Sequence, residues 1–169
     1  YHPLTMLTLA LDYKFAGLSP VRYHAVNVLL HLANTALVFW LIWLLGGGRV
    51  FAAAFVALFF GVHPMHVESV TWVSERKDVL YALFFLASLI SYWYYLEKGR
   101  LSFMVLTFAL FVLALLSKAM AAPLPVVLLL LDYWHGRKLS WRTIAEKLPF
   151  FVLSVLFGLL AVKIQSKSA

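Results

Sequence analysis

The chain has 169 residues, of which 64% are hydrophobic and 12% are charged, and it carries a net charge of +7 and no cysteine. This composition excludes an ordinary water-soluble domain, because too little polar surface remains to coat a globule, and the lack of cysteine excludes disulfides, thiolate metal sites and cysteine nucleophiles. The positive charges lie mainly in loops beside lipid headgroups, and no basic helix carries interleaved base-stacking aromatics, so we expect a lipid bilayer and no nucleic acid as a partner.

Residues 3–18 form the first predicted element, an amphipathic helix that is too short to cross a bilayer comfortably. Helical spacing gives it two faces. The apolar face is formed by Leu4, Leu7, Leu11 and Phe15, and the polar face is formed by Thr5, Thr8 and Asp12. Such a helix is typical of the membrane interface. Gly17 is expected to end it, and Ser19 followed by Pro20 to start the next helix.

Six apolar segments follow, and several of them are shorter than the roughly 20 residues that cross a bilayer. They cover about residues 21–45, 50–62, 79–96, 101–116, 121–134 and 148–164. The sequence therefore predicts an all-α, polytopic membrane helical bundle that forms a single domain over residues 1–169. Short spans leave the loop 63–78 and the turn around Lys118 below the headgroups, where non-helical backbone is tolerated only beside a protein cavity.

The first span carries four polar residues on one stripe, because they are spaced three, four and three apart: His24, Asn27, His31 and Asn34. Facing lipid, each would leave hydrogen-bonding groups unpaired in hydrocarbon. The stripe must therefore face protein or a wet cavity, and we interpret it mainly as a helix-packing surface.

Alternation of the spans places the loops in two groups on opposite sides of the membrane. The loops 46–49, 97–100 and 135–147 form one group, and Lys and Arg divide equally between the two groups. The first group is shorter and denser in positive charge, so we expect it in the cytoplasm. The loop 63–78 and Lys118 then face the periplasm or a lumen.

Ionisable residues are concentrated in this loop, which contains His63, His66, Glu68, Glu75, Arg76, Lys77 and Asp78. Its cations, with Lys118, could bind a phosphate, and imidazole and carboxylate could transfer protons or orient an acceptor. Alternatively, residues 75–78 are only a self-neutralising helix start, His63 only ends the preceding helix, and Lys118 reaches to headgroups. A metal site from His63, His66 and Glu68 has generic spacing and no second cluster, so a divalent metal is not supported and no cofactor is predicted.

Five stretches carry a resemblance to a known family: YHPLTMLTLALD, HAVNVLLHLANTALVFWLI, HPMHVESVTWVSERKDVLYALFFLASLISYWYY, LLSKAM and LPVVLLLLDYW. Together they resemble the membrane region of the transmembrane and tetratricopeptide-repeat-containing (TMTC) proteins and their bacterial relatives. These proteins are GT-C glycosyltransferases and are similar to protein O-mannosyltransferases. The resemblance covers nearly the whole chain in order. One departure is Ala119, where relatives often carry proline.

The resemblance implies a transferase that moves a sugar, with mannose expected, from a polyprenyl-phosphate carrier to a Ser or Thr hydroxyl of a protein. The reaction would take place at the periplasmic face of a bacterial inner membrane or the lumenal face of the endoplasmic reticulum. It implies inversion at the anomeric carbon with an acidic base in the first external loop. That loop would precede Tyr1, so we interpret the chain as a fragment without this base and without the tetratricopeptide repeats.

Within the chain we predict three groups of site residues. His66 and Glu68 are expected to be catalytic, positioning the acceptor or the donor sugar, while Arg76, Lys118 and Lys77 are expected to bind the lipid phosphate. The cavity rim is expected to include His2, Asp12, His63 and His24. Two rival functions remain: a transporter or flippase of lipid-linked substrates, and a non-catalytic membrane anchor of a repeat-containing scaffold protein.

Overall fold

The computed structural model describes residues 2–138 and 140–168, with side chains to residue 164, and this part of the chain contains helices and no strand. The helices are α1 (Pro3–Ala16), α2 (Pro20–Leu45), α3 (Val50–Val62), α4 (Val67–Thr71), α5 (Arg76–Lys98), α6 (Leu101–Ser117), α7 (Leu124–Trp134), α8 (Trp141–Ala145) and α9 (Leu148–Ser168). The predicted all-α fold is confirmed.

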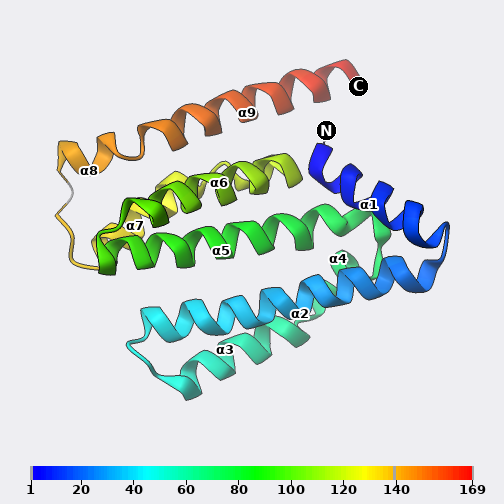
Figure 1. The fold of residues 1–169 in the computed structure, drawn as a ribbon, viewed down its shortest axis with the longest axis horizontal. Helices are drawn as coiled ribbons and strands as arrows, with labels where there is room; N and C mark the ends of the chain where they lie inside the picture. Colours follow the sequence, from blue (N-terminus) through cyan, green and yellow to red (C-terminus); the bar gives the residue numbers. More distant parts are fainter. Residues whose placement is uncertain (1, 139, 169) are drawn as a thin grey trace.

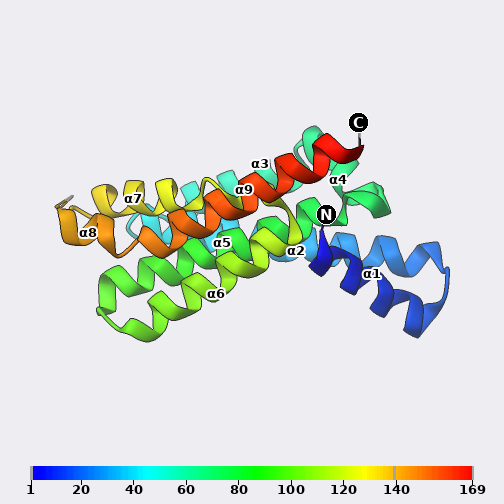
Figure 2. The same cartoon turned by 90° about the horizontal axis from the view of Figure 1, so that it is seen from above.

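The longer helices lie side by side in an elongated bundle (Figures 1 and 2). The turn between α2 and α3, the turn between α5 and α6, and α8 lie at one end, on the left in Figure 1. Helix α1, helix α4 and the start of α5 lie at the other end. The loops that were expected on opposite sides of the membrane, from the alternation of the spans, therefore lie at opposite ends of the bundle.

Within residues 2–138 and 140–168, two helical stretches are long and apolar enough to cross a membrane, namely Pro20–Leu45 and Val73–Lys98. A third candidate combines Val50–Val62 with Pro64–Thr71, which meet at a bend of 50°. The apolar helices Leu101–Ser117, Ala119–Trp134 and Leu148–Ile164 are shorter. The number of spans, six by sequence, stays a prediction.

The segment after α3, expected to be one loop, is folded into short helical turns. A 3₁₀ turn covers Pro64–His66, α4 follows it, and a second 3₁₀ turn covers Val73–Glu75. Helix α5 then begins at Arg76, three residues before the predicted start at residue 79, so that Asp78 lies in its first turn. A carboxylate there interacts favourably with the positive end of the helix dipole, which favours this earlier start.

Polar side chains are buried while large apolar ones are exposed, as expected in lipid. Thr5 and Asp12 of α1 are buried, whereas Phe15 is 67% exposed and Phe51 of α3 is 93% exposed. An apolar core between α5, α6, α7 and α9 includes Tyr92, Phe111, Leu124, Leu128 and Phe150. This distribution, with the apolar spans, is that of an integral membrane bundle.

Small residues let α3 approach α2 closely. Ala53 and Ala57 are buried on α3, and a Cβ added to Gly61, one turn further on, would lie 3.2 Å from the Thr35 side chain of α2. Four-residue spacing of small residues is a common way for membrane helices to pack. This contact brings the end of α3 against the middle of α2, beside the short helical turns.

An ionic cluster that the sequence analysis missed lies at the α8 end of the bundle. Asp132 of α7 and Lys147, which precedes α9, form an ion pair in which both side chains are fully buried. The Tyr92 hydroxyl donates to Asp132 at 2.7 Å, and Arg137 donates to the two Glu146 carboxylate oxygens at 2.8 and 2.7 Å. The cluster joins α5, α7 and the start of α9.

We expect Lys147→Met to destabilise the bundle by about 3 kcal/mol, because it removes the buried cation of the Asp132 carboxylate and leaves only the partly exposed Arg137, 3.4 Å away. Thermal unfolding of the purified protein in detergent measures this change. The exposed Lys138 offers the control, and Lys138→Met should leave the unfolding temperature nearly unchanged. Equal unfolding temperatures for the two variants would contradict a structural role for the buried pair.

Candidate functional site

The polar stripe of α2 binds the backbone of the segment that carries the predicted site. Its hydrogen bonds to carbonyl oxygens are 2.8 to 3.3 Å long and run from Asn27 to Val70 and Trp72, from His31 to Gly61, and from Asn34 to Val79. Asn27 and Asn34 are buried, whereas His24 is exposed. The interpretation of the stripe as a packing surface is confirmed for Asn27, His31 and Asn34.

Arg76 connects α1, α2 and α5. Its guanidinium donates to the Asp12 carboxylate, to Asn27 Oδ1 at 2.9 Å and to the Tyr23 carbonyl oxygen at 3.0 Å. The Arg76 side chain is 0% exposed, whereas Arg22, 3.9 Å from Asp12, is 48% exposed. The guanidinium of Arg76 is therefore fully engaged inside the bundle.

A polar cavity of about 230 Å³ lies next to this connection, between α2, the end of α3, the start of α5 and the turn after α6. Its lining includes His31, Asn34, His66, Asp78, Tyr81 and Lys118. Of the predicted catalytic and phosphate-binding residues, the structure brings His66 and Lys118 together here. The other residues of those two groups do not line the polar cavity.

Lys118 and Asp78 form an ion pair in the polar cavity. Their side chains are 18% and 24% exposed, so the pair is sheltered from solvent and is still accessible from the cavity. Lys118 follows the last turn of α6 in an extended conformation, and the Lys118 ammonium lies 6.0 Å from the Tyr81 ring centre. Asp78 was not among the predicted site residues, although it belongs to the ionisable loop, for which a self-neutralising helix start at residues 75–78 was the alternative.

His66 is packed against aromatic rings. Its ring centre is 4.4 Å from that of Phe60, 5.6 Å from His31 and 6.0 Å from His63. An imidazole with an ordinary pKa of about 6.5 is mostly neutral at pH 7. The neutral ring can both donate and accept a hydrogen bond.

Glu68 is exposed on α4 and does not line the polar cavity. Residues 64–71 are helical rather than extended, and side chains two positions apart diverge on a helix. His66 and Glu68 are therefore not brought together, although their spacing would have aligned them in an extended segment. The expected role of Glu68 in the reaction stays a prediction.

Three of the other predicted residues have local partners. Lys77 pairs with Glu75 at 3.0 Å, His63 accepts a hydrogen bond from the Met65 amide at 3.2 Å, and Asp12 is bound by Arg76. Burial, and also the charges of Lys77 and Lys118, lower the pKa of His2, so His2 lies at the same end of the bundle. Among the described residues, no group of three or more His, Asp or Glu side chains could hold a metal ion.

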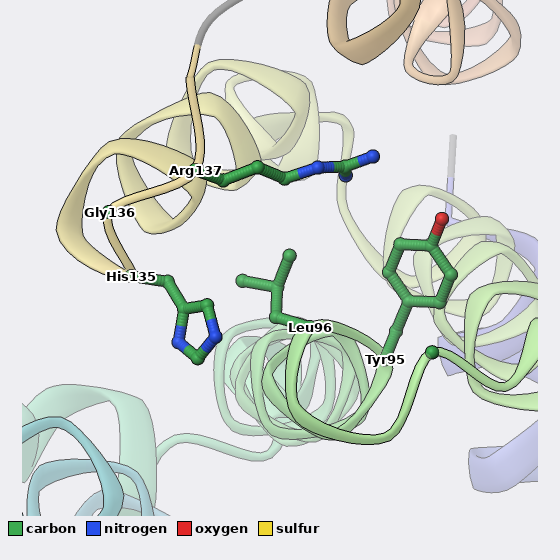
Figure 3. Close-up of a pocket in the computed structure, with 6 residues that line it drawn as sticks. Tyr95, Leu96, His135, Gly136 and Arg137 are labelled. Carbon is green, nitrogen blue, oxygen red and sulfur yellow. The ribbon is translucent and has the colours of Figure 1, made fainter.

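A larger cavity, of about 410 Å³, lies at the other end of the bundle and is lined by Tyr95, Leu96, His135 and Arg137 among others (Figure 3). Arg137 extends towards Tyr95 across this cavity, with its guanidinium carbon 5.9 Å from the Tyr95 ring centre. The hydrogen bonds that Arg137 donates to the Glu146 carboxylate raise the pKa of Arg137. Because Arg137 is engaged in the ionic cluster, we assign the candidate site to the polar cavity instead.

Comparison with curated proteins confirms the resemblance. The chain is 45% identical to protein O-mannosyl-transferase tmtc2 of Xenopus laevis over 54% of the chain, 39% identical to protein O-mannosyl-transferase TMTC4 of Homo sapiens over 54%, and 36% identical to protein O-mannosyl-transferase Tmtc1 of Drosophila melanogaster over 72%. It spans 11%, 14% and 14% of the length of these relatives, respectively. No family model and no solved structure matches.

We expect Arg76→Met to destabilise the protein by about 3–5 kcal/mol, because Asp12 would be left buried without its main cationic partner. Unfolding followed by circular dichroism in detergent measures the change. Arg22→Met removes the exposed arginine beside the same carboxylate and should cost less than about 1 kcal/mol. An Arg76 variant as stable as the Arg22 variant would show that the connection does not hold α1 in place.

Proposed function

The chain is homologous to the membrane region of TMTC-type proteins, and from this premise we propose that it is part of a GT-C-type glycosyltransferase. In this proposal the enzyme transfers mannose from a polyprenyl-phosphate carrier to a Ser or Thr hydroxyl of a protein, at the periplasmic or lumenal face. One observation carries the proposal for this site: His66, Asp78 and Lys118 line one small cavity at a single end of an apolar bundle. The names of the homologues support the transferase class.

Lys118 is the proposed partner of the lipid phosphate. As the bond between the anomeric carbon and the phosphate oxygen breaks, negative charge grows on that oxygen, and a fixed cation in a water-restricted site stabilises such charge strongly. Asp78 holds the ammonium in place before the donor arrives. Lys77, which is partly exposed beside Glu75, adds positive charge at the rim.

Arg76 supports this site through structure. Its donors are directed at Asp12, Asn27 and Tyr23, so it fixes the start of α5, where Asp78 lies, relative to α2. This positioning role replaces the direct phosphate contact that the sequence suggested. Fixed placement of a charged group matters for catalysis because no reorganisation is then needed during the reaction.

In the proposed reaction the acceptor oxygen bonds to the anomeric carbon while the bond from that carbon to the phosphate oxygen breaks. The acceptor proton passes to a carboxylate, which the resemblance places in the first external loop. His66, neutral and inside the polar cavity, would hydrogen-bond the sugar or the acceptor hydroxyl. Glu68, exposed on α4, would act outside the cavity on the side from which the protein acceptor approaches.

A non-catalytic membrane anchor is the second candidate. It is favoured by the internal pairing of the charged residues, since Arg76 is bound to Asp12 and Lys118 to Asp78. In an anchor these pairs would serve stability alone. The two candidates differ in what removal of Lys118 does to sugar transfer.

We expect Lys118→Met to lower mannose transfer by about 10²-fold, as for the loss of one charge-stabilising donor, and Lys118→Arg to retain a measurable part. The full-length protein, radiolabelled polyprenyl-phosphate mannose and a Ser/Thr peptide provide the assay. Lys98, whose ammonium lies over Tyr94 at the other end of the bundle, is the matched control, and Lys98→Met should transfer normally. Transfer that is unchanged in Lys118→Met would favour the anchor.

A further inference from the structure

Asn34 has an unusual position in the wall of the polar cavity. It lies in the middle of α2, is 1% exposed and lines the cavity. Its amide nitrogen donates to the Val79 carbonyl oxygen at 2.8 Å. Because a carbonyl oxygen can only accept, this bond fixes which end of the Asn34 amide faces α5.

The amide oxygen of Asn34 has no hydrogen-bond donor in the described part of the chain. An unpaired buried acceptor is costly, and native proteins keep few of them. Asn27, on the same stripe, provides a direct comparison, since its amide nitrogen also binds backbone carbonyls while its oxygen accepts from Arg76 at 2.9 Å. Thus Asn27 is saturated within the bundle, and Asn34 is left with a free acceptor.

The residues around Asn34 restrict which kind of hydrogen-bond donor can bind its amide oxygen. The Lys118 ammonium is held by Asp78, and His31 is committed to the Gly61 carbonyl at 3.0 Å. The other donors that line the cavity, Ser69, Tyr81 and His66, form no hydrogen bond with this oxygen, so a ligand that enters the cavity can supply the donor. A hydroxyl fits, because it can donate to Asn34 and at the same time accept from a neutral imidazole such as His66.

We propose that Asn34 Oδ1 accepts a hydrogen bond from a hydroxyl of the donor sugar and thereby distinguishes a glycosylated lipid phosphate from the bare lipid phosphate. This inference rests on the proposed function of the same cavity. It divides the cavity wall into two parts: Lys118 binds the phosphate that both lipids share, and Asn34 recognises the sugar that only one of them carries. Asn34 is then a specificity-determining residue in addition to its structural bond with Val79.

The test compares binding of two probes to the full-length protein, farnesyl phosphate and its mannosyl ester, by equilibrium titration in detergent. We expect the wild-type protein to prefer the mannosyl ester. In Asn34→Leu this preference should fall by about 5-fold, the change that one neutral hydrogen bond produces. The preference is a ratio of two affinities of one variant, so a partly unfolded fraction cancels.

Ser88→Ala is the control, since it removes a buried side chain that also binds a backbone carbonyl, that of Thr107 at 3.1 Å, and Ser88 does not line the polar cavity. It should leave the preference unchanged even where it weakens the protein. Asn34→Asp tests rescue, because a buried, protonated carboxyl can still donate to Val79 and accept from a ligand hydroxyl. We expect it to restore most of the preference.

The outcomes separate this inference from the proposed function. If neither probe binds the wild-type protein, or if Lys118→Met binds both as tightly as wild type, the proposed function fails and the inference fails with it. If both probes bind through Lys118 and Asn34→Leu keeps the full preference, only the inference is overturned. An Asn34 variant that loses affinity for a Ser/Thr peptide while keeping the preference would assign the hydroxyl to the acceptor, and this also overturns it.

Discussion

The irregular backbone between α3 and α5 depends on hydrogen bonds from the side of α2. In a bilayer no water is available to pair exposed carbonyl groups, so such a segment is stable only where protein provides the donors. Asn27 provides them to the carbonyl oxygens of Val70 and Trp72. His31 and Asn34 bind the carbonyl oxygens on either side of the segment, those of Gly61 in the last turn of α3 and Val79 near the start of α5. Because these bonds fix both walls of the polar cavity, the geometry of the candidate site follows from the packing surface of one helix.

The charged residues divide by their exposure into two kinds. The Arg76 side chain, and both side chains of the Asp132–Lys147 pair, are 0% exposed and have several partners inside the bundle. Asp78 and Lys118, in contrast, are 24% and 18% exposed and face a cavity. Completely buried pairs hold helices together and cannot reach a ligand, whereas a sheltered but accessible pair can exchange one partner for another. This difference is the reason for choosing the Lys118 end of the bundle as the candidate site.

The sequence predicts what periodicity and composition control. The sequence predicts the all-α membrane bundle. The three- and four-residue spacing also correctly predicts that Asn27, His31 and Asn34 face protein. It does not predict the direction of the Arg76 side chain, because that depends on Asp12, 64 positions away. The exposure of Glu68 depends on the helical conformation of α4, which the pairing with α2 favours. The position of Asp132 could have been noticed in the sequence, because a single acidic residue in an apolar segment is unusual. Sequence spacing alone, however, could not identify Lys147 as its partner.

The pairing of Lys118 with Asp78 has a consequence for how a donor would bind. Without Asp78, the ammonium would be an uncompensated charge in a sheltered hollow, and the empty site would be costly. With Asp78 present, an incoming phosphate must share the ammonium with a carboxylate of the same sign, which reduces what the phosphate contact contributes to affinity. The remaining affinity must then come from uncharged contacts to the rest of the ligand. In such a site a neutral acceptor such as Asn34 affects both how tightly the donor binds and which donor is chosen.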